Sequence, residues 1–177
     1  MKILIAGTQG AGKSTISRGV AYKLKKTNPE LRISSPSEWW INQGLVFYLS
    51  AGKSKGIIES AWLRYLSDNI LLEEFNDIVI YDSHPYLTDI VEERQTGDEE
   101  IINLLKNDLE SMDFIFHLKN DHPVKIDVYR DDTKDLDKEN NKLIQKILKT
   151  HQGYSIIDYS SGIETIMVKL NESNNNR

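Results

Sequence analysis

The chain has 177 residues, of which 39% are hydrophobic and 28% are charged, a composition typical of one globular domain. Its formal net charge of −5 argues against a general nucleic-acid or membrane-surface binder, because such proteins carry a basic stripe. The lack of cysteine excludes disulfides, thiolate metal sites and cysteine nucleophiles, and no apolar run is long enough for a signal peptide or a membrane span, so we expect a cytoplasmic protein.

Predicted strands alternate with predicted helices along the whole chain. In chain order we predict a strand at 2–7, a helix at 13–26, a strand at 31–35, helices at 37–49 and 57–76, a strand at 77–82, a helix at 98–111, a strand at 113–118, a helix at 134–150, a strand at 154–159 and a helix at 161–170. This alternation predicts an α/β fold with a mostly parallel sheet. With no repeat or linker, we expect one domain, 1–171, and a polar, disordered tail, 172–177.

One motif near the N-terminus has a specific chemical meaning. Residues 7–14, GTQGAGKS, match G-x-x-x-x-G-K-[ST] completely and lie between the first predicted strand and the first predicted helix. Glycines let successive N–H groups turn toward phosphate oxygens, Lys13 would reach the β- and γ-phosphates, and Ser14 would hold Mg²⁺. We therefore predict a site for ATP and Mg²⁺ formed by Thr8, Gln9, Gly10, Ala11, Gly12, Lys13, Ser14 and Thr15.

The rest of the chain narrows the class of P-loop protein. Lys119, Asn120 and Asp121 stand in the wrong order for the N-K-x-D guanine reader of GTPases, and the chain is short for a large ATPase motor. Its length, its early P-loop and its five or so βα units resemble the small P-loop nucleoside and nucleotide kinases, above all the nicotinamide-riboside-kinase-like and deoxynucleoside-kinase-like group. Three stretches carry the local likeness: SPSEWW (35–40), IVIYDS (78–83) and the charged segment 129–148.

The resemblance implies both an architecture and a reaction. The fold would be a three-layer P-loop NTPase-type sandwich, with its five strands in the order 2-3-1-4-5 and helices on both faces. The activity would be ATP- and Mg²⁺-dependent phosphoryl transfer to a small acceptor, most simply a nucleoside or a nucleotide. We expect no nucleic-acid or membrane partner, and we name a homodimer as one candidate assembly.

Besides Lys13, three residues are assigned catalytic roles. Asp82 ends a buried apolar strand, where a carboxylate would organise Mg²⁺ or orient the acceptor hydroxyl; alternatively, it is a turn acid. Glu38 would take the proton of that hydroxyl, or it is only a helix-start glutamate capped by a nearby serine. Arg130 would close over the phosphates from a lid, or it belongs to a solvated charged loop.

Three tryptophans could either stack on a ligand or fill the core, and one histidine is expected to have a structural role. Trp39, Trp40 and Trp62 could stack on a flat base, although large aromatic residues more often fill cores. Two adjacent tryptophans on a helix cannot both face inward, so one of Trp39 and Trp40 is expected to line a cleft or an interface. His117 lies inside a predicted strand and is expected to be a hydrogen-bonded core or edge residue.

The chain also departs from the pattern of its relatives. Deoxynucleoside kinases usually place an arginine directly after the acid of the third strand, whereas Ser83 and His84 follow Asp82 here. The riboside-kinase-like proteins place an arginine in the region that Ile41 and Asn42 occupy. The acceptor therefore stays open, as do two alternative functions: an ATPase that drives a partner, and a nucleotide-dependent regulatory module.

Overall fold

The five strands form one parallel sheet. The computed structural model describes residues 1–8, 10–36, 55–91, 98–119 and 134–175. The strands are β1 (Lys2–Ala6), β2 (Ile33–Ser34), β3 (Ile78–Tyr81), β4 (Phe114–Leu118) and β5 (Tyr154–Ile157). Their order is β2-β3-β1-β4-β5, and every pairing between neighbours is parallel. The predicted fold class and strand order are thereby confirmed.

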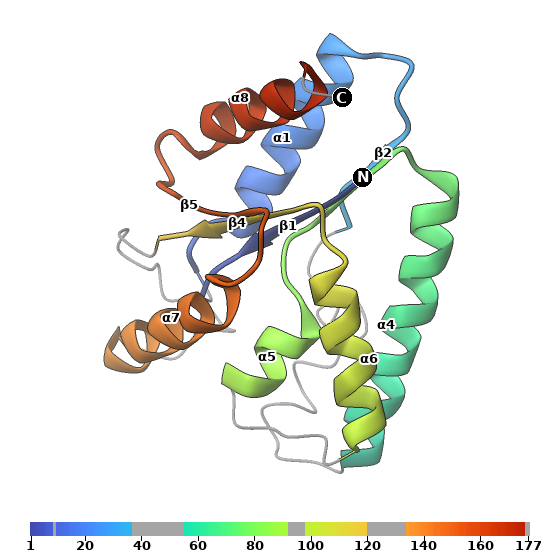
Figure 1. Cartoon of the computed structure of the whole chain (residues 1–177), viewed down its shortest axis with the longest axis vertical. Coiled ribbons are helices and arrows are strands. Elements are labelled where there is room, and N and C mark those ends of the chain that lie inside the picture. The colour runs from blue at the N-terminus through green and yellow to red at the C-terminus, as the bar shows by residue number, and fades with distance from the viewer. Residues whose placement is uncertain (9, 37–54, 92–97, 120–133, 176–177) are drawn as a thin grey trace.

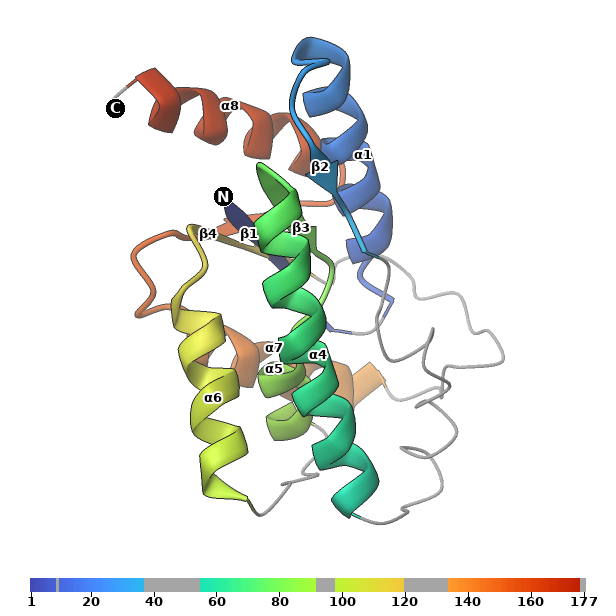
Figure 2. The ribbon, with the colours of Figure 1, turned by 90° about the vertical axis from the view of Figure 1, so that its right-hand side faces the viewer.

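Helices cover both faces of this sheet. The described helices are α1 (Lys13–Thr27), α4 (Lys55–Phe75), α5 (Pro85–Val91), α6 (Glu99–Glu110), α7 (Lys134–Leu148) and α8 (Gly162–Asn175). Helices α1 and α8 lie on one face, and α4, α5, α6 and α7 lie on the other (Figure 1). The view from the side shows the sheet between these two groups (Figure 2). The molecule is therefore a three-layer sandwich.

The central strand β1 shows why the two layers of helices form. Alternate side chains of a strand point to opposite faces of its sheet. Ile3 and Ile5 enter the cluster shared with α1 and α8, whereas Leu4 and Ala6 enter the cluster shared with α5, α6 and α7. All four side chains are at most 1% exposed. A continuous apolar run is therefore what a strand in the middle of a parallel sheet requires.

The structure differs from the predicted elements in two places. Helix α5, at Pro85–Val91, was not predicted, because no element was expected between the strand at 77–82 and the helix at 98–111. The predicted tail was also wrong in part, since α8 continues to Asn175 and makes 172–175 helical. The predicted helix at 37–49 lies outside the described residues.

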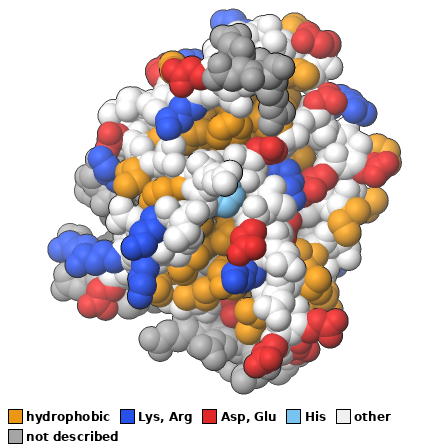
Figure 3. All heavy atoms as spheres, viewed as in Figure 1, with side chains coloured by type: hydrophobic (Ala, Val, Ile, Leu, Met, Phe, Trp, Pro, Cys, Tyr) orange, Lys and Arg blue, Asp and Glu red, His pale blue; other side chains and the backbone are white. Residues whose placement is uncertain are grey.

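The surface carries charges of both signs. On the face of Figure 1, basic and acidic side chains alternate with hydrophobic ones over the described helices (Figure 3). Within the described residues no helix combines the length and hydropathy that crossing a bilayer demands. The features that distinguish the molecule lie instead at one edge of its sheet.

Candidate functional site

The P-loop and Asp82 leave the same edge of the sheet. Strand β1 ends at Ala6 and continues into Gly7, and strand β3 ends at Tyr81 and continues into Asp82. The two strands are neighbours, and Leu4 pairs with Tyr81. Parallel α/β sheets bind ligands in the crevice beyond the carboxyl ends of their strands. The fold therefore brings together two segments that the sequence singled out separately.

Three glycines of the P-loop, Gly7, Gly10 and Gly12, have backbone conformations that other residues rarely adopt. Gly7 has φ of 149°, and a Cβ atom there would lie 3.0 Å from the carbonyl oxygen of Leu118. Gly12 has φ of 94°, and its Cβ would lie 2.4 Å from the ring of Tyr159. Positive φ and close approach of this kind both favour glycine. The loop is therefore built for a tight curl against β4 and the segment after β5.

The start of α1 fits an anionic ligand. Gly12 occupies the N-cap position and has no side chain to occupy the space in front of the first turn, which also holds no acidic residue. The N-terminus of a helix attracts anions through its N–H groups and its dipole. Lys13 adds a cation there: its side chain is 4% exposed, and its Nζ donates to the carbonyl oxygen of Thr8 at 3.0 Å. Phosphates therefore match this site in charge and in geometry.

Mg²⁺ also fits the side chains at this edge. Ser14 follows Lys13 in the first turn of α1 and is half-buried, and Asp82 is 3% exposed. Magnesium is usually held by one or two protein oxygens together with phosphate oxygens, and a hydroxyl and a carboxylate are suitable ligands. Ser14 and Asp82 are therefore suitable ligands for a nucleotide-bound magnesium ion.

The other predicted site residues divide into two groups. Gln9, Glu38, Arg130, Trp39 and Trp40 lie outside the described residues. Thr8, Gly10, Ala11 and Thr15 lie in the loop and in the first turn of α1, as the motif requires.

Trp62 belongs to the core. Its side chain is 1% exposed and packs with Tyr65 and Leu105 between α4 and α6. A ring enclosed in this way is not available to stack on a ligand. The core interpretation of Trp62 is therefore the one that the structure supports.

His117 is likewise a hydrogen-bonded core residue, as predicted. Its Nδ1 lies 3.0 Å from the hydroxyl of Tyr154, and its Nε2 lies 2.6 Å from Oδ1 of Asn141. Burial lowers the pKa of His117, although the hydrogen bond with Asn141 acts in the opposite direction. The neutral ring is therefore favoured in the folded protein.

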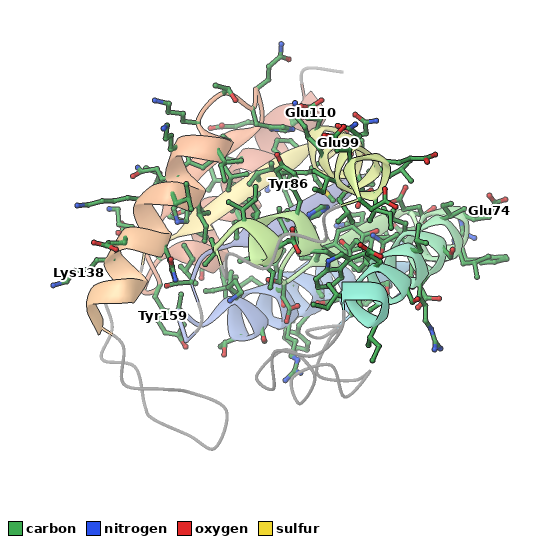
Figure 4. The ribbon with its side chains drawn as sticks, turned by 90° about the horizontal axis from the view of Figure 1, so that it is seen from below. Glu74, Tyr86, Glu99, Glu110, Lys138 and Tyr159 are labelled. Atoms are coloured by element: carbon green, nitrogen blue, oxygen red, sulfur yellow. The ribbon has the colours of Figure 1, made fainter. Side chains whose placement is uncertain are left out.

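Three residues near this edge were missed by the sequence analysis. His84 is fully buried directly before α5, and Asp89 is 5% exposed within that helix. Tyr159, labelled in Figure 4, follows β5, and its ring occupies the space that a Cβ atom on Gly12 would need. The available signal for α5 was Pro85, because proline is favoured at the first position of a helix.

Three solved structures with the same fold are kinases of nucleosides or nucleotides. No family model matches the chain, and no curated protein does. A structure of deoxyadenosine kinase from M. mycoides with bound dATP is similar at a TM-score of 0.58, with 20% identity over 97% of this chain and 100% of that one. The chain has the fold of these enzymes.

Two further solved structures also match nearly the whole chain. The M. mycoides deoxyadenosine kinase with dCMP and dCDP gives a TM-score of 0.56 and 18% identity, over 97% of this chain and 99% of that one. Thymidylate kinase from Ehrlichia chaffeensis gives 0.57 and 16%, over 98% of this chain and 97% of that one. The fold that the resemblance implied is therefore confirmed along nearly the whole chain.

Proposed function

We propose that this protein is a P-loop kinase that transfers the γ-phosphoryl group of ATP to a nucleoside, a nucleotide or a similar small acceptor. The observation that carries the proposal is the position of buried Lys13 and buried Asp82 beyond the carboxyl ends of adjacent strands. The full-length likeness to deoxyadenosine and thymidylate kinases supports it.

The candidate site residues then have defined roles in the transfer. Residues 8–15 hold the phosphates with backbone N–H groups, and Lys13 stabilises the charge that develops on the transferred group. Ser14 and Asp82 hold the magnesium ion, which when bound neutralises charge on the β- and γ-phosphates. Arg130 remains our candidate for a cation that closes over the phosphates.

The chemical step forms one bond and breaks another. The acceptor oxygen bonds to the γ-phosphorus, the bond from that phosphorus to the oxygen bridging it to the β-phosphate breaks, and ADP leaves. The hydroxyl proton passes to a carboxylate, for which Asp82 and Glu38 are the two candidates. The protein contributes mainly by position and charge, as is general for phosphoryl transfer.

The test is ADP release from Mg-ATP with and without single acceptors. The panel contains nucleosides, nucleoside monophosphates and nicotinamide riboside, and Lys13→Ala is the inactive reference. Lys26→Ala is the matched control, because Lys26 is an exposed lysine on the same helix, and it should behave as the wild type. Loss of one charge-stabilising group in the transition state should lower kcat about 100-fold or more.

The outcomes separate the three candidate functions. Release that requires one acceptor and is lost in Lys13→Ala would establish the kinase and name its substrate class. Acceptor-independent release that is lost in Lys13→Ala would contradict the kinase and indicate an ATPase. ATP binding without release under any condition would indicate a regulatory module.

A further inference from the structure

His84 closes the N-terminus of α5 completely. Pro85 has no N–H, and the N–H of Tyr86 donates to Nδ1 of His84 at 3.2 Å. The N–H groups of Leu87 and Thr88 both donate to the backbone carbonyl oxygen of His84 at 3.1 Å. One residue therefore satisfies the donors of the first turn, which usually need several partners. Figure 4 shows α5 and labels Tyr86, the residue whose N–H the ring accepts.

The other nitrogen of the ring binds a different helix. Nε2 of His84 lies 3.1 Å from Oδ2 of Asp108, on α6. Because Nδ1 accepts a hydrogen bond from a backbone N–H, it carries no proton, and Nε2 must carry the proton and donate it. This use of both nitrogens explains why histidine is present instead of serine or asparagine, the usual cap residues. Their side chains could cap α5 but would not also reach Asp108.

The contact with Asp108 is one link in a ring of polar contacts. Asp108 Oδ1 lies 3.4 Å from Nζ of Lys2 on β1, and this Nζ lies 3.2 Å from Oε1 of Glu73 on α4. The hydroxyl of Tyr81, the last residue of β3, donates to Oε1 of Glu73 at 3.0 Å. We call these five residues, from Tyr81 to His84 by way of Glu73, Lys2 and Asp108, the polar ring.

The polar ring is partly buried, and its charges are complementary. The side chains of Lys2, Glu73 and Asp108 are 17%, 31% and 12% exposed, and that of His84 is 0% exposed. Burial of Asp108 acts to raise its pKa, but the hydrogen bond with His84 and the charge and hydrogen bond of Lys2 outweigh burial and lower it. Asp108 is therefore the charged acceptor at the centre of the polar ring, and Asn69 donates to it as well, at 3.4 Å.

The main chain from Tyr81 to His84 completes the polar ring, and Asp82 lies in that segment. On one side of Asp82, Tyr81 is fixed by the sheet and by Glu73. On the other side, only Ser83 separates Asp82 from His84, which is fixed by α5 and α6. Displacing a catalytic group by ~1 Å can lower the reaction rate about 100-fold. Fixing the main chain on both sides of Asp82 therefore has a functional consequence.

We propose that His84 is a positioning residue for Asp82, which it holds in place by capping α5 with one ring nitrogen and binding Asp108 with the other. This inference rests on the proposed function to the extent that Asp82 serves the magnesium-bound nucleotide. His84 itself is two residues away along the chain and acts only through the turn that it anchors.

The most informative variant is His84→Asn. The side-chain oxygen of asparagine accepts the N–H two residues further on, as in an Asx turn, so the cap of α5 is kept. Its shorter side chain does not reach Asp108, so the anchor to α6 is lost. His151→Asn is the matched control, because Nδ1 of His151 also accepts the N–H two residues further on, that of Gly153 at 3.1 Å, next to the amino end of β5.

The first readout is binding, measured by calorimetry with a non-hydrolysable ATP analogue at increasing Mg²⁺ concentrations. Removing a residue that orients a metal ligand costs about 10- to 100-fold in metal affinity, so His84→Asn should weaken the Mg²⁺ effect by that factor. His151→Asn should leave it unchanged. If His84→Asn binds Mg²⁺ with the analogue as the wild type does, the inference is overturned.

A double-mutant cycle separates positioning from general destabilisation. Because His84 acts through Asp82, the double variant Asp82→Asn/His84→Asn should bind Mg²⁺ no more weakly than Asp82→Asn alone. Losses that simply add would show an independent structural effect and would overturn the inference. The ¹⁵N spectrum of the wild-type imidazole adds a test without any variant: a proton on Nδ1 of His84 would overturn it too.

These results do not depend on finding the acceptor. A wild type that binds Mg-ATP but phosphorylates nothing in the panel contradicts the proposed function, while the binding cycle still decides the role of His84. If the wild type is an active kinase and His84→Asn binds Mg²⁺ with the analogue as the wild type does, the proposed function is supported. The inference about His84 is then overturned.

Discussion

Gly12 joins the P-loop to the ring of Tyr159, and the contact allows no added methyl group. A Cβ atom at Gly12 would meet Tyr159 Cε2 at 2.4 Å, and φ of 94° disfavours any other residue. We expect Gly12→Ala to lower the free energy of unfolding by about 1–3 kcal/mol, because a strained backbone conformation is added to the displacement of the ring. Urea unfolding followed by circular dichroism measures this.

Gly56 supplies the matched control for that substitution. It lies in α4, and a Cβ atom there would meet nothing within 4 Å. Gly56→Ala should therefore raise the free energy of unfolding, by up to about 1 kcal/mol, because alanine favours the helix. Equal effects at the two positions would contradict the role assigned to the contact with Tyr159.

At the scale of single residues, the sequence predicts what depends on neighbours along the chain. The P-loop needs glycines, a lysine and a hydroxyl at a fixed spacing, so its residues are visible in eight consecutive letters. The polar ring is different, because Lys2 meets Asp108 across 106 positions of sequence. Nothing in a single sequence indicates such a pairing, and His84 was therefore given no role by the sequence analysis.

At the scale of elements, the start of α6 is set by one side chain. Asp98 Oδ1 accepts the N–H of Glu100 at 2.9 Å and that of Ile101 at 3.2 Å. Asp98→Ala should cost about 1 kcal/mol of stability, as is usual for loss of an N-cap, whereas Asp98→Asn should cost little because asparagine caps equally well. Thermal unfolding of both variants tests this, and a large loss in Asp98→Asn would contradict it.

The pair of Arg32 and Asp77 joins the ends of β2 and β3. The side chain of Arg32 donates from its Nε and its guanidinium NH₂ to Asp77, and its backbone N–H donates to Asp77 Oδ2 at 2.8 Å. The side-chain and backbone hydrogen bonds from Arg32 lower the pKa of Asp77 from 3.8 to about 2. Carboxyl NMR titration should therefore give a midpoint near this value.

The sign of the effect on stability follows from that shift. A carboxyl whose pKa is lower in the folded state stabilises the fold above its unfolded value, and this contribution is lost as the pH falls toward about 2. Arg32→Gln should return the midpoint toward 3.8. An unchanged midpoint in that variant would show that Arg32 is not the cause.

Elements with a strong apolar pattern were predicted well, whereas the short helix α5 was not predicted. Strands β1 and β3 follow from their apolar runs, and α1 follows from its spacing. Helix α5 has only seven residues, and its cap is a histidine, which sequence rules do not count among cap residues. The polar end of α8 was expected to be disordered, although the helix continues through it to Asn175.

At the scale of the whole molecule, α8 closes one layer of the sandwich. Leu170 is 2% exposed in the cluster under α1 and α8, whereas Val168 on the same helix is 55% exposed. Leu170→Ala should cost about 2–5 kcal/mol, as for other buried leucines. Val168→Ala should stay within about 0.5 kcal/mol, and chemical denaturation of the two variants checks the difference.

The strand order also determines when the nucleotide edge can form during translation. The ribosome makes β1 and the P-loop before the strands that flank β1, which are residues 78–81 and 114–118. Contacts between segments so distant in sequence form slowly and late. A nascent chain therefore carries its P-loop without the full support of both neighbouring strands until residue 118 has left the exit tunnel, and during that interval its apolar strand β1 is a target for chaperones.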